Sequence, residues 1–253
     1  MLMNLLIRNY MYFANRNMPV KPYSLSFWEK KKAFWQRFSG KENILCPSYR
    51  WMKTPGKSIP VPELKGLYDN DTLGHWTMDA ASMVLLWNRL VKERPKVIVE
   101  CGCGVSTIMF AKYFSLHRPD GILLSLEQDS KEKARLEGKL KGLGLEKGIH
   151  IYHLPVVGPD QGYDFAQFGG LASLPFMEPF DWLVVDGPAG GDDSRYSTVP
   201  SLQSMAKPGA VWFLDDSLRD GELSILERWS HLPGVVVEGI YPIGKGLGAG
   251  SYK

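Results

Sequence analysis

The chain has few of the features that mark secreted, membrane-spanning or zinc-binding proteins. Only three of its 253 residues are cysteines, and two of these, Cys101 and Cys103, stand in one short turn, which excludes a disulfide framework. No apolar run approaches the ~20 residues that a bilayer-spanning helix needs. The five histidines show no zinc-ligand spacing. These absences favour a cytoplasmic protein.

The sequence also lacks an even distribution of charge. Its formal net charge is +3, but residues 1–60 hold eleven Lys or Arg against two Glu, a local charge of +9. The same residues hold 11 of the 30 aromatic side chains. We therefore divide the chain into a basic, aromatic N-terminal extension and connector at 1–74 and a second, mildly acidic domain at 75–253.

The extension contains one predicted helix. Ser26 and Glu29 form a capping box, and the helix ends near Phe38. The aromatic side chains of this helix fall on one side of it. That side either packs on the second domain or on another copy of the chain, as in a homodimer, or it lies on an anionic membrane surface. The latter predicts a peripheral contact of residues 1–40 with the inner membrane surface. No nucleic-acid-binding motif accompanies the positive charge, which disfavours nucleic acid as a partner.

From residue 77 onward, strand and helix patterns alternate. Buried apolar runs predict strands near 97–100, 122–127, 149–154, 181–186, 210–215, 235–239 and 246–252. Helices are predicted near 77–93, 105–116, 130–141, 198–206 and 219–230. Such alternation is typical of an α/β protein with a Rossmann-like, doubly wound sheet. We expect the sheet to be mostly parallel, with an antiparallel last strand.

The turn after the first of these strands carries the strongest functional signal. Glycines let the backbone approach a ligand closely, and the amides of the following helix face that ligand. A dinucleotide fingerprint needs a third glycine where this chain has Thr107, which disfavours a nicotinamide oxidoreductase. The acid at the strand end repels a pyrophosphate and suits an ammonium or sulfonium group. The turn comprises Glu100, Gly102, Cys103, Gly104, Ser106 and Thr107.

The second strand also ends in an acid, Glu127, which stands 25 residues after Gly102. An acid at that place can accept hydrogen bonds from both hydroxyls of a ribose. The alternative is that Glu127 caps the helix that follows. We favour the ribose contact because strand, turn and spacing agree.

These motifs resemble those of the class I S-adenosylmethionine-dependent methyltransferases. The resemblance covers the chain from about residue 78 onward and implies that S-adenosylmethionine is the cofactor. It also implies which residues bind that cofactor: Glu100, Gly102, Cys103, Gly104, Ser106, Thr107, Glu127, Gln128 and Asp186.

Three carboxylates follow two neighbouring strands. Asp186 follows the fourth strand, and Asp215 and Asp216 follow the fifth. Close carboxylates raise one another's pKa, and a hard divalent ion such as Mg²⁺ relieves the repulsion. The arrangement resembles metal-dependent O-methyltransferases, the macrocin-type sugar O-methyltransferases in particular, which implies a metal at all three residues. The alternative is that the three acids cap turns and a helix.

The same region is similar to bacterial methyltransferases associated with surface-polysaccharide assembly. The similarity rests on Asp186-Gly187-Pro188, on Ser194-Arg195-Tyr196 and on Arg219 with Glu222. It implies that the acceptor is a hydroxyl or carboxyl group of a glycan. Arg195 and Arg219 either hold an acidic group of the acceptor or pair with neighbouring acids.

No motif marks a general base. The metal-dependent enzymes place a charged residue soon after the fourth-strand acid, where this chain has Gly187 to Gly191. Candidates for the catalytic residues are Asp186, Asp216 and His75, with Asp192 and Asp193 as further possible bases.

The sequence thus predicts a methyltransferase that acts on oxygen of a small-molecule or glycan acceptor. Two alternatives stay open: a catalytically silent cofactor-binding protein that docks to a membrane or a partner, and an aminopropyl transferase-like enzyme.

Overall fold

The computed structural model describes residues 61–64, 66–67, 77–158, 162–166, 178–241 and 245–253. The helix predicted from the capping box at Ser26 lies outside these residues, as do the domain boundary at 74/75 and His75. The predicted membrane or dimer contacts of residues 1–40 also lie outside them.

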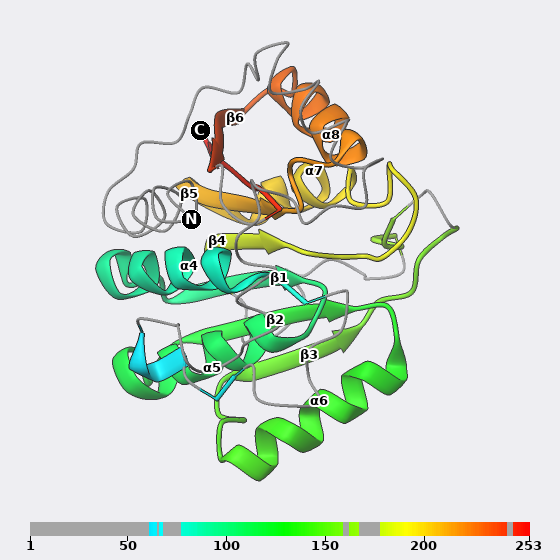
Figure 1. The fold of residues 1–253 in the computed structure, drawn as a ribbon. Coiled ribbons are helices and arrows are strands. Elements are labelled where there is room, and N and C mark those ends of the chain that lie inside the picture. The colour runs from blue at the N-terminus through cyan, green and yellow to red at the C-terminus, as the bar shows by residue number, and fades with distance from the viewer. Residues whose placement is uncertain (1–60, 65, 68–76, 159–161, 167–177, 242–244) are drawn as a thin grey trace, which may run out of the picture.

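A seven-stranded sheet forms the centre of the described fold (Figure 1). Across the sheet the strands run in the order β3 (Ile149–His153), β2 (Ile122–Glu127), β1 (Val97–Cys101), β4 (Phe180–Val185), β5 (Ala206–Asp215), β7 (Leu247–Tyr252) and β6 (Val235–Tyr241). The pairs among β1 to β5 are parallel, whereas β7 is antiparallel to both of its neighbours. The predicted Rossmann-like fold with an antiparallel last strand is confirmed.

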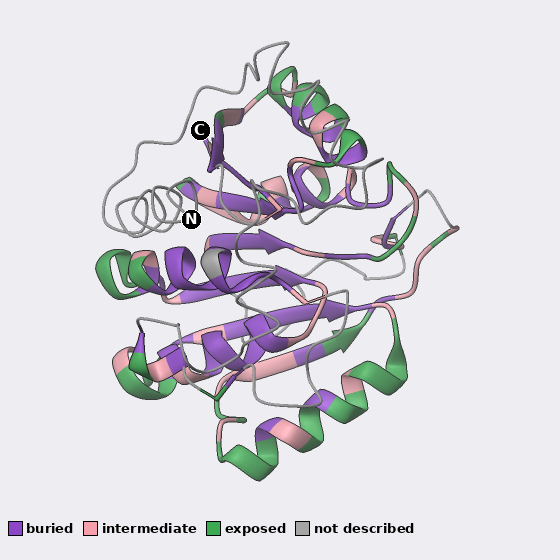
Figure 2. Ribbon diagram, in the orientation of Figure 1, coloured by how far each residue is buried: buried purple, intermediate pink, exposed green. Residues whose placement is uncertain are grey.

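Helices cover both faces of this sheet. Helices α4 (Ala80–Glu93), α5 (Val105–His117) and α6 (Ser130–Leu143) share one apolar core with the sheet, together with the short turn η1 (Pro62–Leu64). Helices α7 (Thr198–Leu202) and α8 (Asp220–Ser230) share the other. Successive strand residues point to opposite faces, so Ile98 joins the first core and Val99 the second. Figure 2 shows the central strands mostly buried and the exposed residues mainly on the outer sides of the helices.

Local capping explains where two helices begin. Asp79 Oδ1 accepts a hydrogen bond from Ser82 N at 3.0 Å, so α4 begins at Ala80, three residues later than predicted. The Asp129 carboxylate accepts from the amide of Lys131 at 2.7 Å and starts α6. Gly144 ends α6 with a left-handed φ of 66°.

The boundary between the predicted helix at 198–206 and the predicted strand at 210–215 was wrong. Helix α7 ends at Leu202, a 3-10 turn η3 (Gln203–Met205) follows, and β5 begins at Ala206. Pro208 and Gly209 fall between these two predicted elements, but a shift in register between β4 and β5 accommodates them inside the strand.

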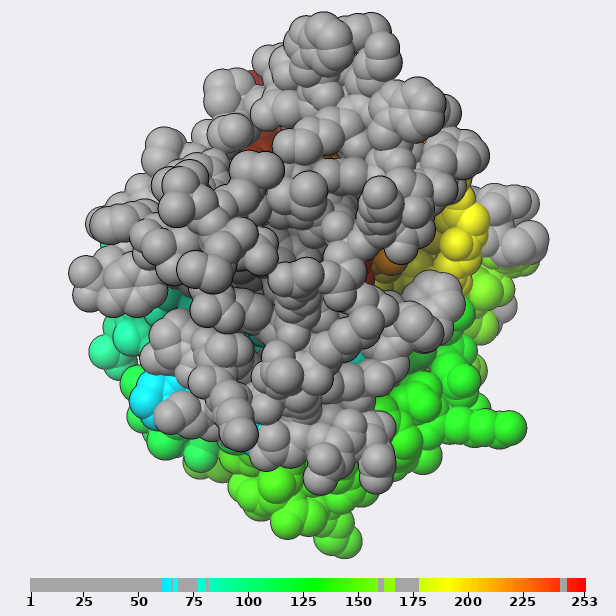
Figure 3. Space-filling model, viewed as in Figure 1, coloured from blue at the N-terminus to red at the C-terminus, as the bar shows by residue number. Residues whose placement is uncertain are grey.

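None of the described helices is both long enough and apolar enough to cross a bilayer. In the space-filling view, green residues that include α6 form the lower margin of the molecule, and yellow residues between β4 and α7 form part of the right margin (Figure 3).

Because β1, β2, β4 and β5 are parallel, their carboxyl ends meet at one edge of the sheet. A ligand site is expected at that edge.

Candidate functional site

A cavity of about 600 Å³ lies at the carboxyl ends of β1, β2 and β4. This volume falls in the usual range of small-molecule sites. The structure places eight of the predicted site residues in its wall: Gly102, Cys103, Gly104, Ser106, Glu127, Gln128, Asp186 and Asp216. Glu100, Thr107 and Asp215 are buried and do not line the cavity.

The two glycines of the turn after β1 have different roles. Gly102 has a φ of 90°, and a Cβ there would lie 2.8 Å from the backbone nitrogen of Gly187. That residue therefore has to be glycine because two turns approach each other closely. A Cβ at Gly104, in contrast, would meet nothing within 4 Å. Since Gly104 lines the cavity, the space in front of it is open to a ligand.

Glu100 lies beneath this turn and is fully buried. Its carboxylate accepts hydrogen bonds from the hydroxyls of Ser106 (2.5 Å), Thr107 (2.6 Å) and Ser125 (2.7 Å). Burial raises the pKa of Glu100 from 4.5 to about 7, although these hydroxyls lower it. In this arrangement Glu100 joins the turn to α5 and β2, which differs from the direct cofactor contact expected from the sequence.

Glu127 faces the cavity at the end of β2. Its Oε2 accepts from the Cys103 amide at 2.9 Å, and its Oε1 accepts from the Asp129 amide at 2.8 Å. Each oxygen keeps a further lone pair for a hydroxyl of a ligand. The neighbouring Gln128 Oε1 is buried without a hydrogen-bond partner among the described residues. A ligand donor in the cavity would satisfy this acceptor.

The three aspartates come together at the ends of β4 and β5. One carboxylate oxygen from each of Asp186, Asp215 and Asp216 lies within 4.8 Å of the others. Burial raises the pKa of Asp186 to about 6, even though Arg195 lowers it. Burial also raises the pKa of Asp215, and the neighbouring carboxylates raise it further. Asp216 adopts a left-handed φ of 60°, which few residues other than glycine adopt.

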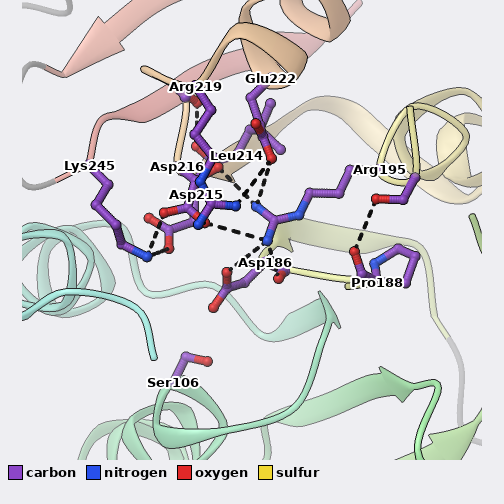
Figure 4. Close-up of polar contacts among 12 residues, drawn as sticks. Ser106, Asp186, Pro188, Arg195, Leu214, Asp215, Asp216, Arg219, Glu222 and Lys245 are labelled. Atoms are coloured by element: carbon purple, nitrogen blue, oxygen red, sulfur yellow. Dashed lines mark hydrogen bonds and ion pairs between the residues drawn. The ribbon is translucent and has the colours of Figure 1, made fainter. Parts of the chain in front are cut away.

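Three cations of the chain lie against this cluster (Figure 4). Lys245 Nζ is 2.5 Å from Asp216 Oδ1, and Arg219 Nη2 is 2.5 Å from Asp216 Oδ2. Arg195 Nη2 lies 3.4 Å from Asp186 Oδ1 and 3.6 Å from Asp216 Oδ2. The carboxylates that share one edge of the sheet are therefore neutralised largely from within the chain.

Arg195 also holds the two strand ends together. Its guanidinium is almost fully buried and donates to the backbone carbonyls of Asp186 at 2.8 Å and Asp215 at 3.1 Å. It lies 3.5 Å from the carboxylate of Glu222 on α8. In the structure, Arg195 therefore pairs with acids of the chain, which is one of the two roles considered from the sequence.

The carboxylates alone are the donor type that Mg²⁺ prefers. Their surroundings do not suit that ion, because both oxygens of Asp216 already face a cation. A divalent ion at the centre of the cluster would lie close to Lys245 and Arg195, with strong repulsion. The residues as arranged do not fit a divalent ion.

Sequence reasoning missed two residues of this region. Lys245 lies two residues before the start of β7 and carries no motif. Tyr163 lines the cavity and donates its hydroxyl to the carbonyl of Leu126 at 2.9 Å. Of the further possible bases, Asp192 and Asp193 do not line the cavity, and Asp193 pairs with Arg228.

A scan against protein-family models and a search of curated protein sequences give no match for the chain. Solved structures do match. The SAH-bound methyltransferase PaMTH1 of Podospora anserina aligns with a TM-score of 0.56 at 16% identity, over 94% of this chain and 100% of that one. An O-methyltransferase from Bacillus cereus in complex with SAH gives 0.57 at 14% identity, over 89% and 98% of the two chains.

A third similar structure is the O-methyltransferase TomG of Streptomyces achromogenes in complex with SAM. Its TM-score is 0.54 at 16% identity, over 89% of this chain and 97% of that one. These likenesses span nearly the whole of the solved chains. At such identities they establish that this chain has the fold of those methyltransferases.

Proposed function

We propose that the chain is an S-adenosylmethionine-dependent methyltransferase that methylates an oxygen of a small-molecule or glycan acceptor. The observation that carries this proposal is Glu127, a carboxylate held toward the cavity by two backbone amides. It stands beside the open turn at Gly104, which is the arrangement that a ribose and its attached chain require. That several structures of the same fold are O-methyltransferases supports oxygen as the acceptor atom.

When bound, S-adenosylmethionine supplies an electrophilic methyl carbon that an acceptor oxygen attacks as the carbon–sulfur bond breaks and the acceptor proton leaves. The chain contributes position and a proton acceptor. Asp186 lines the cavity between the turn and the cluster, and its pKa of about 6 suits a base near neutral pH. Asp216 lines the same wall, but both of its oxygens face cations. Asp186 is therefore the stronger candidate base.

Binding and turnover test this proposal together. Calorimetry on the full chain should show micromolar binding of S-adenosylmethionine or its demethylated product and no binding of NAD. Label from the methyl group should then pass to members of a panel of sugars and catechols. Binding of NAD in place of S-adenosylmethionine would overturn the proposed identity of the cofactor. Binding without transfer to any acceptor would favour the catalytically silent alternative.

The divalent metal predicted from the sequence at Asp186, Asp215 and Asp216 is not part of this proposal, because the cations around these residues do not suit it, and no step of the proposed reaction depends on it. Methyl transfer should be measured with and without a chelator. Reversible loss of activity in chelator would support the metal. Unchanged activity would remove it and leave the methyltransferase proposal intact.

The role of the N-terminal extension also stays a prediction. If residues 1–40 bind an anionic membrane, the chain should sediment with anionic vesicles and be released by raised salt. If they pack on the second domain or on another copy, their deletion should lower the melting temperature. Failure to sediment at low salt would rule out the membrane contact.

A further inference from the structure

We infer that the ammonium group of Lys245 is the resident cation of the cluster formed by Asp186, Asp215 and Asp216, and that it excludes divalent metal ions from this cluster. The inference concerns only these four side chains. It does not depend on which cofactor or acceptor occupies the cavity.

The position of the ammonium is the first argument. Lys245 Nζ lies 2.5 Å from Asp216 Oδ1 and 3.8 Å from Asp215 Oδ2. An ion bound by these two oxygens at about 2.1 Å would have to enter the same space. Figure 4 shows the lysine side chain reaching toward both carboxylates, with its ammonium end beside them. Lysine and metal are thus alternatives at one place.

The backbone of Lys245 is fixed on both sides, which is the second argument. Its amide donates to Asp79 Oδ2 at 3.2 Å, at the start of α4. Its carbonyl accepts from the Leu218 amide at 3.0 Å, and the next carbonyl, of Gly246, accepts from the Ser217 amide at 3.0 Å. These bonds connect the lysine to the segment that directly follows Asp216. The backbone of Lys245 is therefore fixed beside Asp216, and its side chain, which is only 26% exposed, places the ammonium against that carboxylate.

The state of Asp215 is the third argument. Its side chain is fully buried, and neither carboxylate oxygen has a hydrogen-bond partner among the described residues. A buried carboxyl group of this kind can be ionised only where a positive charge lies nearby. Arg195 and Arg219 form their ion pairs with Asp186, Asp216 and Glu222. Lys245 supplies the positive charge on the side of Asp215.

Binding of Mn²⁺ tests the inference without any assay of methyl transfer. The full chain is titrated with Mn²⁺, and the free ion is followed by its paramagnetic resonance signal. Wild type should show no saturable site in the range where Lys245→Met binds one ion, and the affinity of Lys245→Met should be higher by at least about ten-fold. Adding Asp215→Asn to that variant should remove the gained site.

Lys207→Met is the matched control, because Lys207 forms a comparable lysine–aspartate pair with Asp181 at 2.6 Å but stands at the opposite end of β5. It should bind Mn²⁺ no better than wild type. Equal gains in both variants would show that loss of any positive charge suffices, and would overturn the inference.

Wild type alone decides the matter if Lys245→Met does not fold. Its melting temperature should not rise on addition of Mn²⁺ or Mg²⁺. A one-to-one Mn²⁺ site in wild type that Asp216→Asn abolishes would overturn the inference, since lysine would then move aside for the ion. Binding of S-adenosylmethionine, measured separately, reports on the proposed function and not on this outcome.

Discussion

The fold buries acidic side chains at two neighbouring places, and the groups that surround the acids differ between the two. Under the turn after β1, Glu100 is surrounded by the hydroxyls of Ser106, Thr107 and Ser125. At the ends of β4 and β5, the aspartates face Lys245, Arg195 and Arg219. Hydroxyls give the first acid hydrogen bonds without an opposite charge, whereas the second group has opposite charges as direct neighbours.

This difference separates a structural acid from chemically useful ones. A carboxyl group with a pKa near 7 and no access to the cavity can stabilise a turn whether or not it is ionised. Asp186 and Asp216 border the cavity, where charge and proton transfer matter. The cations keep these acids together at a place where repulsion would otherwise separate them.

The largest effect on stability is expected from removing a cation from the aspartate cluster, at Arg195. Arg195→Met removes the guanidinium that faces the buried Asp186, Asp216 and Glu222. The free energy of unfolding in urea should fall by about 3–5 kcal/mol, because buried charges lose their partner. Arg118→Met is the control, since Arg118 pairs with an exposed Asp120, and it should lose less than about 1 kcal/mol. Similar losses in both variants would contradict this account.

A somewhat smaller effect on the free energy of unfolding is expected from Glu100 beneath its hydroxyls, and this effect depends on pH. The pKa of Glu100 is raised from 4.5 to about 7 on folding, so the folded state holds its proton more tightly. Its contribution is present below pH 4.5 and is lost as the pH rises toward 7, by about 3 kcal/mol in all. Asp186 and Asp215 act in the same direction, so the measurement is a difference between two proteins.

Glu100→Gln should remove this part of the slope. Urea unfolding is followed from pH 4.5 to 7.5 for wild type and variant. The stability of wild type should fall more steeply than that of Glu100→Gln across this range. Parallel curves throughout would show that Glu100 is not the titrating group.

The smallest expected effect sharpens the contrast between structural and ligand-facing acids. Glu127→Ala should weaken binding of the demethylated cofactor by about 1.5–3 kcal/mol, as for a lost charge-assisted hydrogen bond. Glu132 also borders the cavity but is exposed on α6, so Glu132→Ala should change the affinity much less. Calorimetry measures both. Unchanged affinity in Glu127→Ala would remove the basis for a ribose contact.

The sequence predicts the cofactor half of the site better than the aspartate half. Strands β1 and β2 are predicted to within one residue, because apolar runs end in an acid and then in turn residues. The glycine turn and Glu127 are local signals of the same kind. The exception there is Glu100, whose hydroxyl partners are visible only once the turn is folded over it.

Around the aspartates the decisive partners are far apart in the sequence. The positions of Asp186, Asp215 and Asp216 follow from the strand pattern, but the pattern contains nothing about which cation meets them. Lys245 becomes a neighbour of Asp216 only because β7 returns antiparallel beside β5. A metal is therefore the natural expectation from the sequence, and an internal ammonium is found only from the fold.

The place of β7 between β5 and β6 has a consequence for biosynthesis. It is the last strand of the described fold in the order of synthesis, yet it has a partner strand on each side. Until it is made, β5 and β6 each present an open edge, which is prone to pairing with other chains. Lys245 is synthesised two residues before it. A chain that stops before Lys245 therefore has a gap between β5 and β6 in its sheet and lacks the ammonium beside its aspartates.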